Sequence, residues 1–232
     1  MTKADSQGVT QTILIADDEP ELLAHHCQAA GFCTATASDG RTALAKARQM
    51  LPSMVVLDLM LPELDGEEVC RALKADAGTR QIPILVFSAK AEEQDRVRSF
   101  ELGADDHVTK PCSPREIILR VKSILRRTNE TLKPIEVIQQ DDLRLDCARH
   151  MVFVQDRVVN LTITEFRLLR ILMEQPGRVH SREALVSEAW GTDSNVNLRA
   201  VDTHMRRLRG KLRKCAPMLK TIRGVGYRFM SD

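Results

Sequence analysis

The chain of 232 residues is long enough for two domains, and its 43% hydrophobic and 28% charged residues are ordinary for a globular protein. No apolar stretch approaches the roughly 18 residues of a membrane span, and the polar N-terminal segment has no apolar core of a signal peptide. We therefore expect a cytoplasmic protein without membrane contact. Six scattered cysteines form no C-x-x-C pair, which argues against a zinc site or a disulfide framework.

The net charge of +2 hides an asymmetry between the two halves of the chain. Residues 1–128 hold 16 Lys and Arg against 19 Asp and Glu, whereas residues 129–232 hold 18 against 13. Ten of the basic residues in the second half, and a single acid, Asp202, lie between Asn197 and Phe229. A basic surface this concentrated predicts a polyanion such as nucleic acid as a partner.

In the first half, short apolar runs alternate with helical patterns. After a polar tail, residues 1–10, we expect strands at 12–16, 33–37, 54–58, 83–88 and 106–109. Helical stretches follow the strands in turn, ending with residues 114–127. This alternation predicts an α/β domain over residues 11–127, a doubly wound five-stranded parallel sheet covered on both faces.

A polar linker, residues 128–134, leads to a different pattern. Residues 135–160 alternate over short segments with turns between them, which predicts a small antiparallel sheet. Three helices follow, the first with a capping box between Thr162 and Glu165, the second at 181–190 and the third beginning near Asn197. Residues 221–229 carry glycines that suit the turn of a hairpin. Residues 135–232 are thus expected to form an α+β domain.

Side chains suited to phosphoryl chemistry follow four of the predicted strands. They are Asp17-Asp18, Asp58, Ser88 and Lys110, and parallel strands bring their carboxyl ends to one crevice. Clustered carboxylates need a cation, and hard oxygen ligands suit Mg²⁺. An ionised Asp58 could then attack phosphorus without a general base, while Lys110 and Ser88 bind phosphoryl oxygens. Taken singly, Asp17-Asp18 could be an acid pair at the N-terminus of a helix, and Lys110 could be an ordinary solvated surface residue. The placement of all four features at strand ends favours a phosphoacceptor site.

Ser88-Ala89 and Lys110-Pro111, together with the three aspartates, resemble the receiver domain of two-component response regulators. The second half resembles the winged-helix domain of the OmpR/PhoB family. The motifs that carry this second resemblance are Leu161-Thr162-x-Thr164-Glu165-Phe166, Ser181-Arg182-Glu183-x-Leu185, Val201-Asp202-x-His204 and Arg223-Gly224-Val225-Gly226-Tyr227. The resemblance covers nearly the whole chain and implies a CheY-like receiver followed by a winged-helix DNA-binding domain, and not an enzyme.

The resemblance also assigns roles at the acid site. It implies that a partner histidine kinase phosphorylates Asp58 and that Ser88 and Lys110 hold the phosphoryl group. Mg²⁺ would be bound directly by Asp18, by Asp58 and by the main-chain carbonyl of Met60, and mainly through water by Asp17.

Two residues depart from the family pattern. His107 stands where the family has an aromatic residue, most often Tyr, that swings inward when the hydroxyl at the position of Ser88 moves to the phosphoryl group. Cys112 stands where the family has an aromatic residue after Lys-Pro. Because imidazole titrates near neutrality, switching here could be pH-sensitive or weaker. A regulator that binds DNA without phosphorylation therefore stays open as an alternative. An aspartyl-phosphate phosphatase is disfavoured, because Met60 stands where a second acid would act and the basic domain would be unexplained.

Active receivers of the family pair through the fourth helix, fifth strand and fifth helix. Carried over, this face predicts a homodimer with the inter-subunit pairs Arg96–Glu116, Asp106–Arg120, Asp105–Arg127 and Glu101–Lys122 around Val97, Phe100 and Leu119. The alternative is an ordinary solvated helix surface, on which such pairs contribute little.

The helix beginning near Asn197 is predicted to bind double-stranded DNA. One stripe is apolar, and the opposite face, with Arg199, Thr203, Arg206, Arg207, Arg213 and Lys214, suits a major groove. Arg223 in the hairpin resembles the family's wing arginine, which enters the minor groove. Further DNA contacts are assigned to His204 and Arg209. Trp190 is either a core residue or, as in the family, a contact to a DNA phosphate through its N–H, and the resemblance favours the contact. The loop from Gly191 to Val196 corresponds to one that can touch RNA polymerase in relatives, and two subunits would occupy tandem half-sites.

Overall fold

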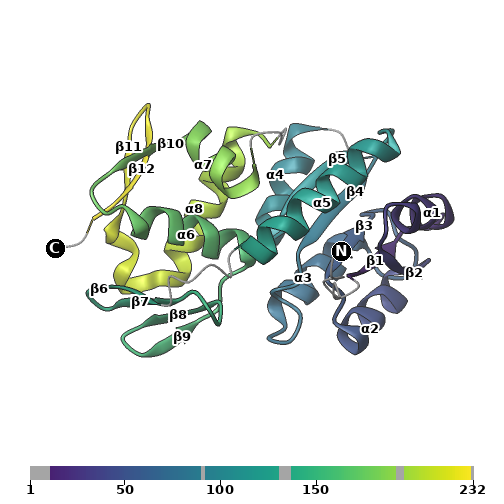
Figure 1. Cartoon of the computed structure of the whole chain (residues 1–232), viewed down its shortest axis with the longest axis horizontal. Helices are drawn as coiled ribbons and strands as arrows, with labels where there is room; N and C mark the ends of the chain where they lie inside the picture. The colour runs from purple at the N-terminus through teal and green to yellow at the C-terminus, as the bar shows by residue number, and fades with distance from the viewer. Residues whose placement is uncertain (1–10, 90–91, 131–136, 192–195, 231–232) are drawn as a thin grey trace, which may run out of the picture.

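The computed structural model describes residues 11–89, 92–130, 137–191 and 196–230, apart from the side chains of residues 127, 129 and 130. The expected tail and residues 131–134 of the expected linker fall outside this part of the chain, as does most of the loop from Gly191 to Val196. Two domains follow one another along the long axis of the molecule (Figure 1). Among the described helices, none has the length and apolarity needed to cross a membrane.

The first domain is built on a five-stranded parallel sheet in the order β2-β1-β3-β4-β5. Its strands are β1 (Thr12–Ala16), β2 (Cys33–Ala37), β3 (Met54–Leu57), β4 (Ile84–Ser88) and β5 (Asp106–Thr109). All four residues of β3 are buried, because the strand lies at the centre of the sheet and is covered on both faces. The predicted doubly wound sheet is thus confirmed.

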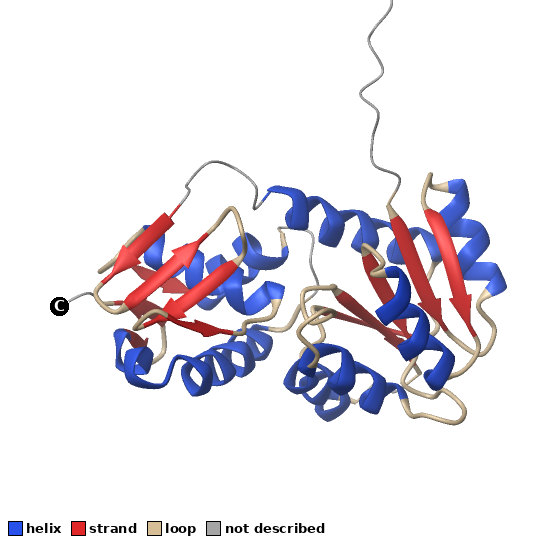
Figure 2. Cartoon of the chain, turned by 90° about the horizontal axis from the view of Figure 1, so that it is seen from below, coloured by secondary structure: helices blue, strands red, loops and turns tan. Residues whose placement is uncertain are grey.

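Helices cover both faces of this sheet (Figure 2). Apolar side chains of α1 (Glu21–Ala29) and α5 (Pro114–Glu130) pack in one cluster with Ile13 and Ile15. Side chains of α2 (Gly40–Met50) and α3 (Gly66–Ala75) pack in another with Leu14 and Ala16, on the same side as α4 (Glu93–Leu102). Successive side chains of β1 therefore point to opposite faces of the sheet and belong to two separate hydrophobic cores. Helix α5 runs three residues past the predicted boundary at 127, so that six residues, 131–136, separate it from the next strand.

The second domain begins with an antiparallel sheet of β6 (Val137–Gln140), β7 (Leu143–Asp146), β8 (Met151–Val154) and β9 (Arg157–Val159). Helices α6 (Ile163–Glu174), α7 (Arg182–Trp190) and α8 (Leu198–Leu212) follow, and a 3-10 helix, η1 (Arg213–Met218), leads to the C-terminal hairpin. The hairpin strands β11 (Leu219–Ile222) and β12 (Gly226–Phe229) form a three-stranded sheet with β10 (Val179–Ser181), in the order β10-β12-β11. The third strand, β10, is an addition to the predicted pattern.

Local signals in the sequence explain where these helices begin. The capping box of α6 is present, with the Thr162 side chain accepting from Glu165 N and the Glu165 side chain accepting from Thr162 N. Ser181 caps α7 by accepting from Ala184 N at 3.1 Å, and Asn197 caps α8. Helix α8 is the helix predicted to bind DNA, and we call it the recognition helix from here on.

The two domains share an apolar contact. Helices α4 and α8 pack against each other, and Phe100 of α4 belongs to the same buried cluster as Trp190 and Leu208 of the second domain. Gln81 reinforces the contact by donating to the main-chain carbonyl of Leu161 at 3.1 Å.

Candidate functional site

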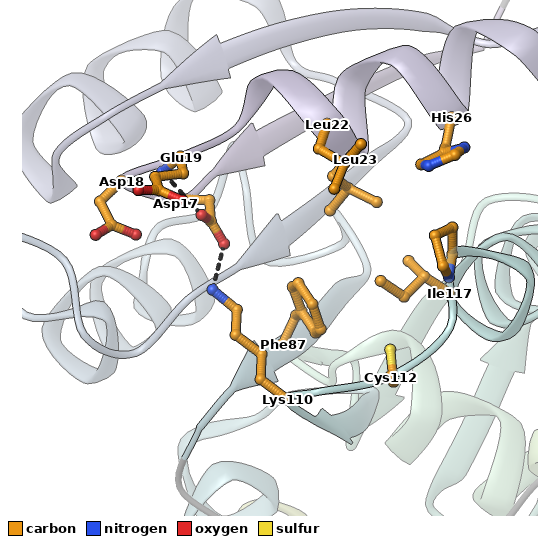
Figure 3. Close-up of a pocket in the computed structure, with 11 residues that line it drawn as sticks. Asp17, Asp18, Glu19, Leu22, Leu23, His26, Phe87, Lys110, Cys112 and Ile117 are labelled. Carbon is orange, nitrogen blue, oxygen red and sulfur yellow. Dashed lines mark hydrogen bonds and ion pairs between the residues drawn. The ribbon is translucent and has the colours of Figure 1, made fainter.

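Three predicted site residues meet at the carboxyl edge of the parallel sheet. Asp17 follows β1, Asp58 follows β3 and Lys110 follows β5. The Nζ of Lys110 donates to Oδ2 of Asp17 at 2.6 Å and to Oδ2 of Asp58 at 2.6 Å, and Figure 3 shows the first of these bonds. Both aspartates are only 5% exposed. One ammonium group therefore bridges two buried carboxylates and reduces their mutual repulsion.

The main chain around Asp58 fixes the position of its carboxylate. Oδ1 accepts a hydrogen bond from Met60 N at 2.9 Å, which leaves Oδ2 directed at Lys110. Gly66 opens α3 directly beside this loop, and a Cβ at Gly66 would lie 2.1 Å from the carbonyl oxygen of Asp58. Only glycine allows the helix to begin so close to the phosphoacceptor candidate.

Lys110 is held as a cation. Its Nζ lies 4.7 Å from the centroid of the Phe87 ring, a contact that our reading of the sequence missed because Phe87 looked like an ordinary strand residue. Partial burial acts to lower the pKa of Lys110, but the hydrogen bonds that it donates to Asp17 and Asp58 outweigh this effect and raise that pKa above its ordinary value. Lys110 can therefore act as a fixed positive charge throughout the physiological range.

The three aspartates are suited to a hard divalent cation. Asp17, Asp18 and Asp58 each offer an oxygen within 4.8 Å of the others, and Asp18 is exposed while its two neighbours are buried. An ammonium group already bridges two of these carboxylates, which shows that a cation fits between them. All-oxygen ligands with one side open to water are those that Mg²⁺ prefers.

The remaining two predicted residues lie on β4 and β5, Ser88 at the carboxyl end of its strand and His107 within β5. Ser88 ends β4 and is fully buried, and it pairs in register with Thr109 of β5. His107 of β5 is 8% exposed, with its Nδ1 3.1 Å from Oγ of Ser99 on α4. His107 thus connects the strand that leads to Lys110 with helix α4. Ser99 was not among the predicted residues, since its role depends on packing between elements.

A cavity of about 390 Å³ opens beside the acid residues (Figure 3). Asp17, Asp18 and Lys110 line it at one end, while Cys112 and Ile117 lie across from α1 at the other. Burial raises the pKa of the Cys112 thiol, so this side chain stays protonated. The cavity therefore adjoins two of the three aspartates and the lysine of the acid site.

The face predicted for receiver pairing is partly covered by the second domain. Phe100 is 3% exposed and packs in the cluster that includes Trp190. The carboxylate of Asp105 is also buried, and it accepts hydrogen bonds from Lys74 Nζ at 2.9 Å and from Thr164 Oγ1 at 2.7 Å. Burial acts to raise the pKa of Asp105, but Lys74 and Thr164 hold it below its ordinary value. In this conformation neither Phe100 nor Asp105 is available to a second subunit.

The rest of that face is accessible to differing degrees. Arg120 donates to Asp106 at 3.0 Å and to Glu116 at 2.9 Å within the same chain. Leu119 is 58% exposed. On the two helices Arg96 and Val97 are half-buried and Lys122 is exposed, whereas the side chain of Arg127 lies outside the described part of the structure.

Two arginines predicted to contact DNA instead meet carboxylates of the receiver. Nη1 of Arg199 lies 2.7 Å from Oε1 of Glu93, and Arg206 forms an ion pair with Glu101. The Asn197 side chain adds a hydrogen bond to Glu93 at 3.3 Å. Arg199 near the start of the recognition helix and Arg206 near its middle are therefore both attached to α4.

Arg207 is held more deeply. Its Nη1 donates to the carbonyl oxygen of Phe100 at 2.8 Å, and its Nε lies 3.4 Å from Oε1 of Glu165. Glu165, fully buried, also accepts from Lys211 Nζ at 2.6 Å. Burial acts to raise the pKa of Glu165, but these two cations bring it below its ordinary value. The carboxylate of the capping box thus anchors the middle of the recognition helix.

Trp190 and His204, assigned to DNA contacts, are buried between the domains. The indole Nε1 of Trp190 donates to the carbonyl oxygen of Asp105 at 2.7 Å. His204 is fully buried with its ring 5.8 Å from the Phe100 ring and 5.5 Å from the Trp190 ring. Neither ring nitrogen has a hydrogen-bond partner among the described residues. Burial lowers the pKa of His204 to about 4.

The other predicted DNA contacts lie nearer the hairpin. Arg209 donates to the carbonyl oxygen of Leu219 at 2.6 Å and to Oγ1 of Thr221 at 2.8 Å, which fixes the hairpin to the recognition helix. Thr203 is 6% exposed. Arg223 is exposed at the hairpin turn, beside Gly224 with its φ of 73°. In this conformation Arg223 is open to a ligand while Arg209 supports the domain.

Both halves of the chain match known families. A model of the response regulator receiver domain matches residues 13–122, and a model of the C-terminal domain of transcriptional regulatory proteins matches residues 156–229. The phosphate regulon transcriptional regulatory protein PhoB of Klebsiella pneumoniae is 39% identical over 226 residues, which cover 95% of this chain and 98% of PhoB. The transcriptional regulatory protein SrrA of Staphylococcus aureus is 41% identical over 234 residues, which cover 95% of this chain and 96% of SrrA.

Solved structures agree with this fold. The response regulator DrrB of Thermotoga maritima, an OmpR/PhoB homologue, has a TM-score of 0.50 at 29% identity, covering 96% of this chain and all of DrrB. A RitR mutant has a TM-score of 0.80 at 24% identity with the same coverage, which shows a common fold.

A receiver joined to a C-terminal regulatory domain defines a DNA-binding response regulator. The chain belongs to the OmpR/PhoB family of two-component response regulators. Membership confirms the fold class and the family expected from the sequence, and it implies a histidine kinase and DNA as partners. The relatives named above regulate transcription.

Proposed function

We propose that a partner histidine kinase phosphorylates Asp58 and that this modification controls receiver pairing and DNA binding. The observation that carries the proposal is the position of Lys110 Nζ, 2.6 Å from both Asp17 and Asp58 at the carboxyl edge of the sheet. A cation held between two carboxylates is close enough to bind a phosphoryl oxygen once Asp58 carries the phosphoryl group. A cavity lined by Asp17, Asp18 and Lys110 adjoins this edge and is the route proposed for the phosphodonor.

The transfer exchanges one bond for another. An Oδ of Asp58 attacks the phosphorus of a phosphohistidine, the P–N bond breaks, and the imidazole nitrogen keeps the electron pair and takes a proton from water. Mg²⁺ would be held by Asp18, by Asp58 and by the carbonyl of Met60, with Asp17 acting through water, and it would neutralise the transferring oxygens. An ionised carboxylate needs no general base for this step.

Two side chains then bind the product. Lys110 exchanges its contact with Asp58 for a phosphoryl oxygen, and the Ser88 hydroxyl donates a second hydrogen bond. His107, bonded to Ser99, would carry the resulting movement of β5 to α4.

The output would be a homodimer on DNA. Receivers would pair through α4, β5 and α5, with Arg120 and its acidic partners at the centre of the contact. The arginines of the recognition helix would enter the major groove and Arg223 the minor groove of each tandem half-site. The loop from Gly191 to Val196 is the segment proposed to reach RNA polymerase.

Sedimentation with and without the phosphoryl mimic beryllofluoride plus Mg²⁺ tests this proposal, on wild type and on Asp58→Asn, which keeps the shape of the side chain. We expect a monomer that dimerises only when Asp58 is present. A dimer in every sample would favour the alternative in which His107 and Cys112 mark a receiver that no longer switches. Rapid turnover of a small phosphate ester would instead favour a phosphatase.

A further inference from the structure

We propose that Asp202 is a positioning residue for DNA binding, because it fixes the angle between the recognition helix and the C-terminal hairpin. This inference rests on the proposed function, in which α8 enters the major groove and Arg223 the minor groove. Asp202 is the single acid between Asn197 and Phe229, where a negative charge weakens the attraction for phosphates. Its contacts explain why an acid stands there.

One oxygen atom of Asp202 connects three elements. Oδ1 accepts from Nε of Arg182, at the start of α7, at 2.8 Å and from the hydroxyl of Tyr227, on β12, at 2.5 Å. Burial and the bond to Asp202 raise the pKa of Tyr227 to about 12, so this hydroxyl keeps its proton and remains a donor. A single carboxylate on α8 therefore holds both the preceding helix and the hairpin.

The ring of Tyr227 is held by two further groups. The guanidinium groups of Arg182 and Arg209 lie over it, 5.3 and 5.5 Å from the ring centroid. Arg209 also donates to two residues of β11, the other strand of the hairpin. Both hairpin strands are thus attached to the recognition helix, β11 through Arg209 and β12 through Asp202.

Strand β10 limits the movement of the hairpin on its other side. It pairs with β12 from Val179–Arg228 to Ser181–Gly226. A Cβ at Gly226 would lie 2.0 Å from the carbonyl oxygen of His180, so the two strands approach closely. The hairpin can then turn only about the line of β10, and such a turn has to break the bond between β12 and α8.

A fixed angle matters because the helix and the hairpin bind different grooves of one duplex. When the hairpin is already in place, Arg223 enters the minor groove without a further loss of conformational freedom. The same rigidity restricts tight binding to duplexes in which the two grooves lie at the matching distance. Asp202 therefore weakens the general attraction for phosphates and, in exchange, makes binding depend on the spacing of the two contacts.

The test uses the full chain activated by beryllofluoride and Mg²⁺. Activated wild type selects a duplex from a random pool, and the duplex is trimmed to one half-site. Base pairs that lose protection from hydroxyl radicals in Arg223→Ala are those under the hairpin. A second duplex has two base pairs inserted before them, which displaces that groove by about 7 Å along the axis and about 70° around it.

Two variants and one control are compared on both duplexes. Tyr227→Phe removes only the hydroxyl and leaves the charge unchanged, whereas Asp202→Ala removes both hydrogen bonds and one negative charge. The control, Asp156→Asn, removes the same charge on the exposed turn between β8 and β9. The spacing penalty is the ratio of the dissociation constants for the inserted and the original duplex. A general loss of stability weakens binding to both duplexes equally and leaves this ratio unchanged.

We expect a spacing penalty of about tenfold for wild type and for the control, and of less than about threefold for Tyr227→Phe and Asp202→Ala. Asp202→Ala should also bind the original duplex more weakly than wild type, although loss of a negative charge alone would strengthen binding. Addition of Arg223→Ala should cost less affinity in both variants than in wild type.

Three results would overturn the positioning role while DNA binding by activated wild type still stands. They are a wild-type penalty in both variants, tighter binding of Asp202→Ala to the original duplex, and a wild type that tolerates the insertion. If activated wild type selects no duplex, the proposed function fails, and the role of Asp202 fails with it.

Discussion

Acidification is predicted to open the contact between the two domains through His204. We call the conformation in which α4 packs against α8 the closed state. In the closed state the His204 ring lies between Phe100 and Trp190 with a pKa of about 4, so it is neutral at any pH near neutrality. Withdrawal of Phe100 would expose the ring, and its pKa could return as far as about 6.5. The open state then binds a proton that the closed state excludes. The contribution of neutral His204 to closure is complete above about pH 6.5 and is lost as the pH falls below that value.

The size of the effect follows from those two values. Between about pH 7.5 and about pH 5.5 the ratio of open to closed molecules should rise by up to about tenfold, or about 1.4 kcal/mol. The charged groups that face His204 do not offset this change, because Asp105 and Glu165 have pKa values held below the ordinary range and stay ionised. The other two facing groups are cations, Lys74 and Arg207.

The assay is the accessibility of Trp190 to acrylamide, together with its emission maximum, over this pH range. Emission intensity alone is unsuitable, because a protonated imidazole 5.5 Å from the indole can quench it. Wild type should become more accessible and red-shifted as the pH falls, and His204→Gln, which cannot protonate, should show a flat profile. Equal pH profiles for the two proteins would refute the reasoning.

Two further predictions concern the acid site and its supporting loop. Lys110→Met should lower the free energy of unfolding without Mg²⁺ by about 1–3 kcal/mol, because Asp17 and Asp58 lose their shared cation. Thermal unfolding should show that Mg²⁺ stabilises this variant more than it stabilises wild type. An equal response of the two proteins to Mg²⁺ would contradict a competition between the ammonium group and the metal. Gly66→Ala should lower the free energy of unfolding in urea by more than about 2 kcal/mol, since its Cβ would lie 2.1 Å from the carbonyl oxygen of Asp58. Gly210→Ala should raise the free energy of unfolding by about 0.5–1 kcal/mol, because its Cβ would meet no neighbouring atom within 4 Å and alanine favours the helix. Similar effects of the two substitutions would contradict the steric argument.

Much of the fold follows from local signals in the sequence. The apolar run ending at Asp58 is a buried central strand, and the capping box at Thr162 begins a helix, because each depends on neighbours only a few residues away. The convergence of Asp17, Asp58 and Lys110 was predictable for a different reason. Parallel strands have a fixed polarity, so residues at their carboxyl ends must share one edge.

The contact between the domains could not be predicted in this way. Phe100 and Arg206 lie on helix faces that, by charge and periodicity, suit a second subunit or DNA. Their partners lie within the same chain instead, an apolar cluster for Phe100 and Glu101 for Arg206. Trp190 and His204 look like ligand-binding residues, yet they are buried because α4 covers them. A helix face specifies the chemistry of its partner, and only the three-dimensional arrangement identifies which of several suitable partners is present.

The short connection between α5 and β6 has a consequence for specificity among related regulators. Only six residues, 131–136, join the two elements, so the recognition helix stays within a few nanometres of its own receiver. A tether of this length gives an effective concentration on the order of millimolar. The α4 surface can therefore be a weak ligand for the recognition helix and still contact it within its own chain. Receivers of other regulators, even with similar acidic helices, would need a comparable concentration to compete, so the contact favours the receiver of the same molecule.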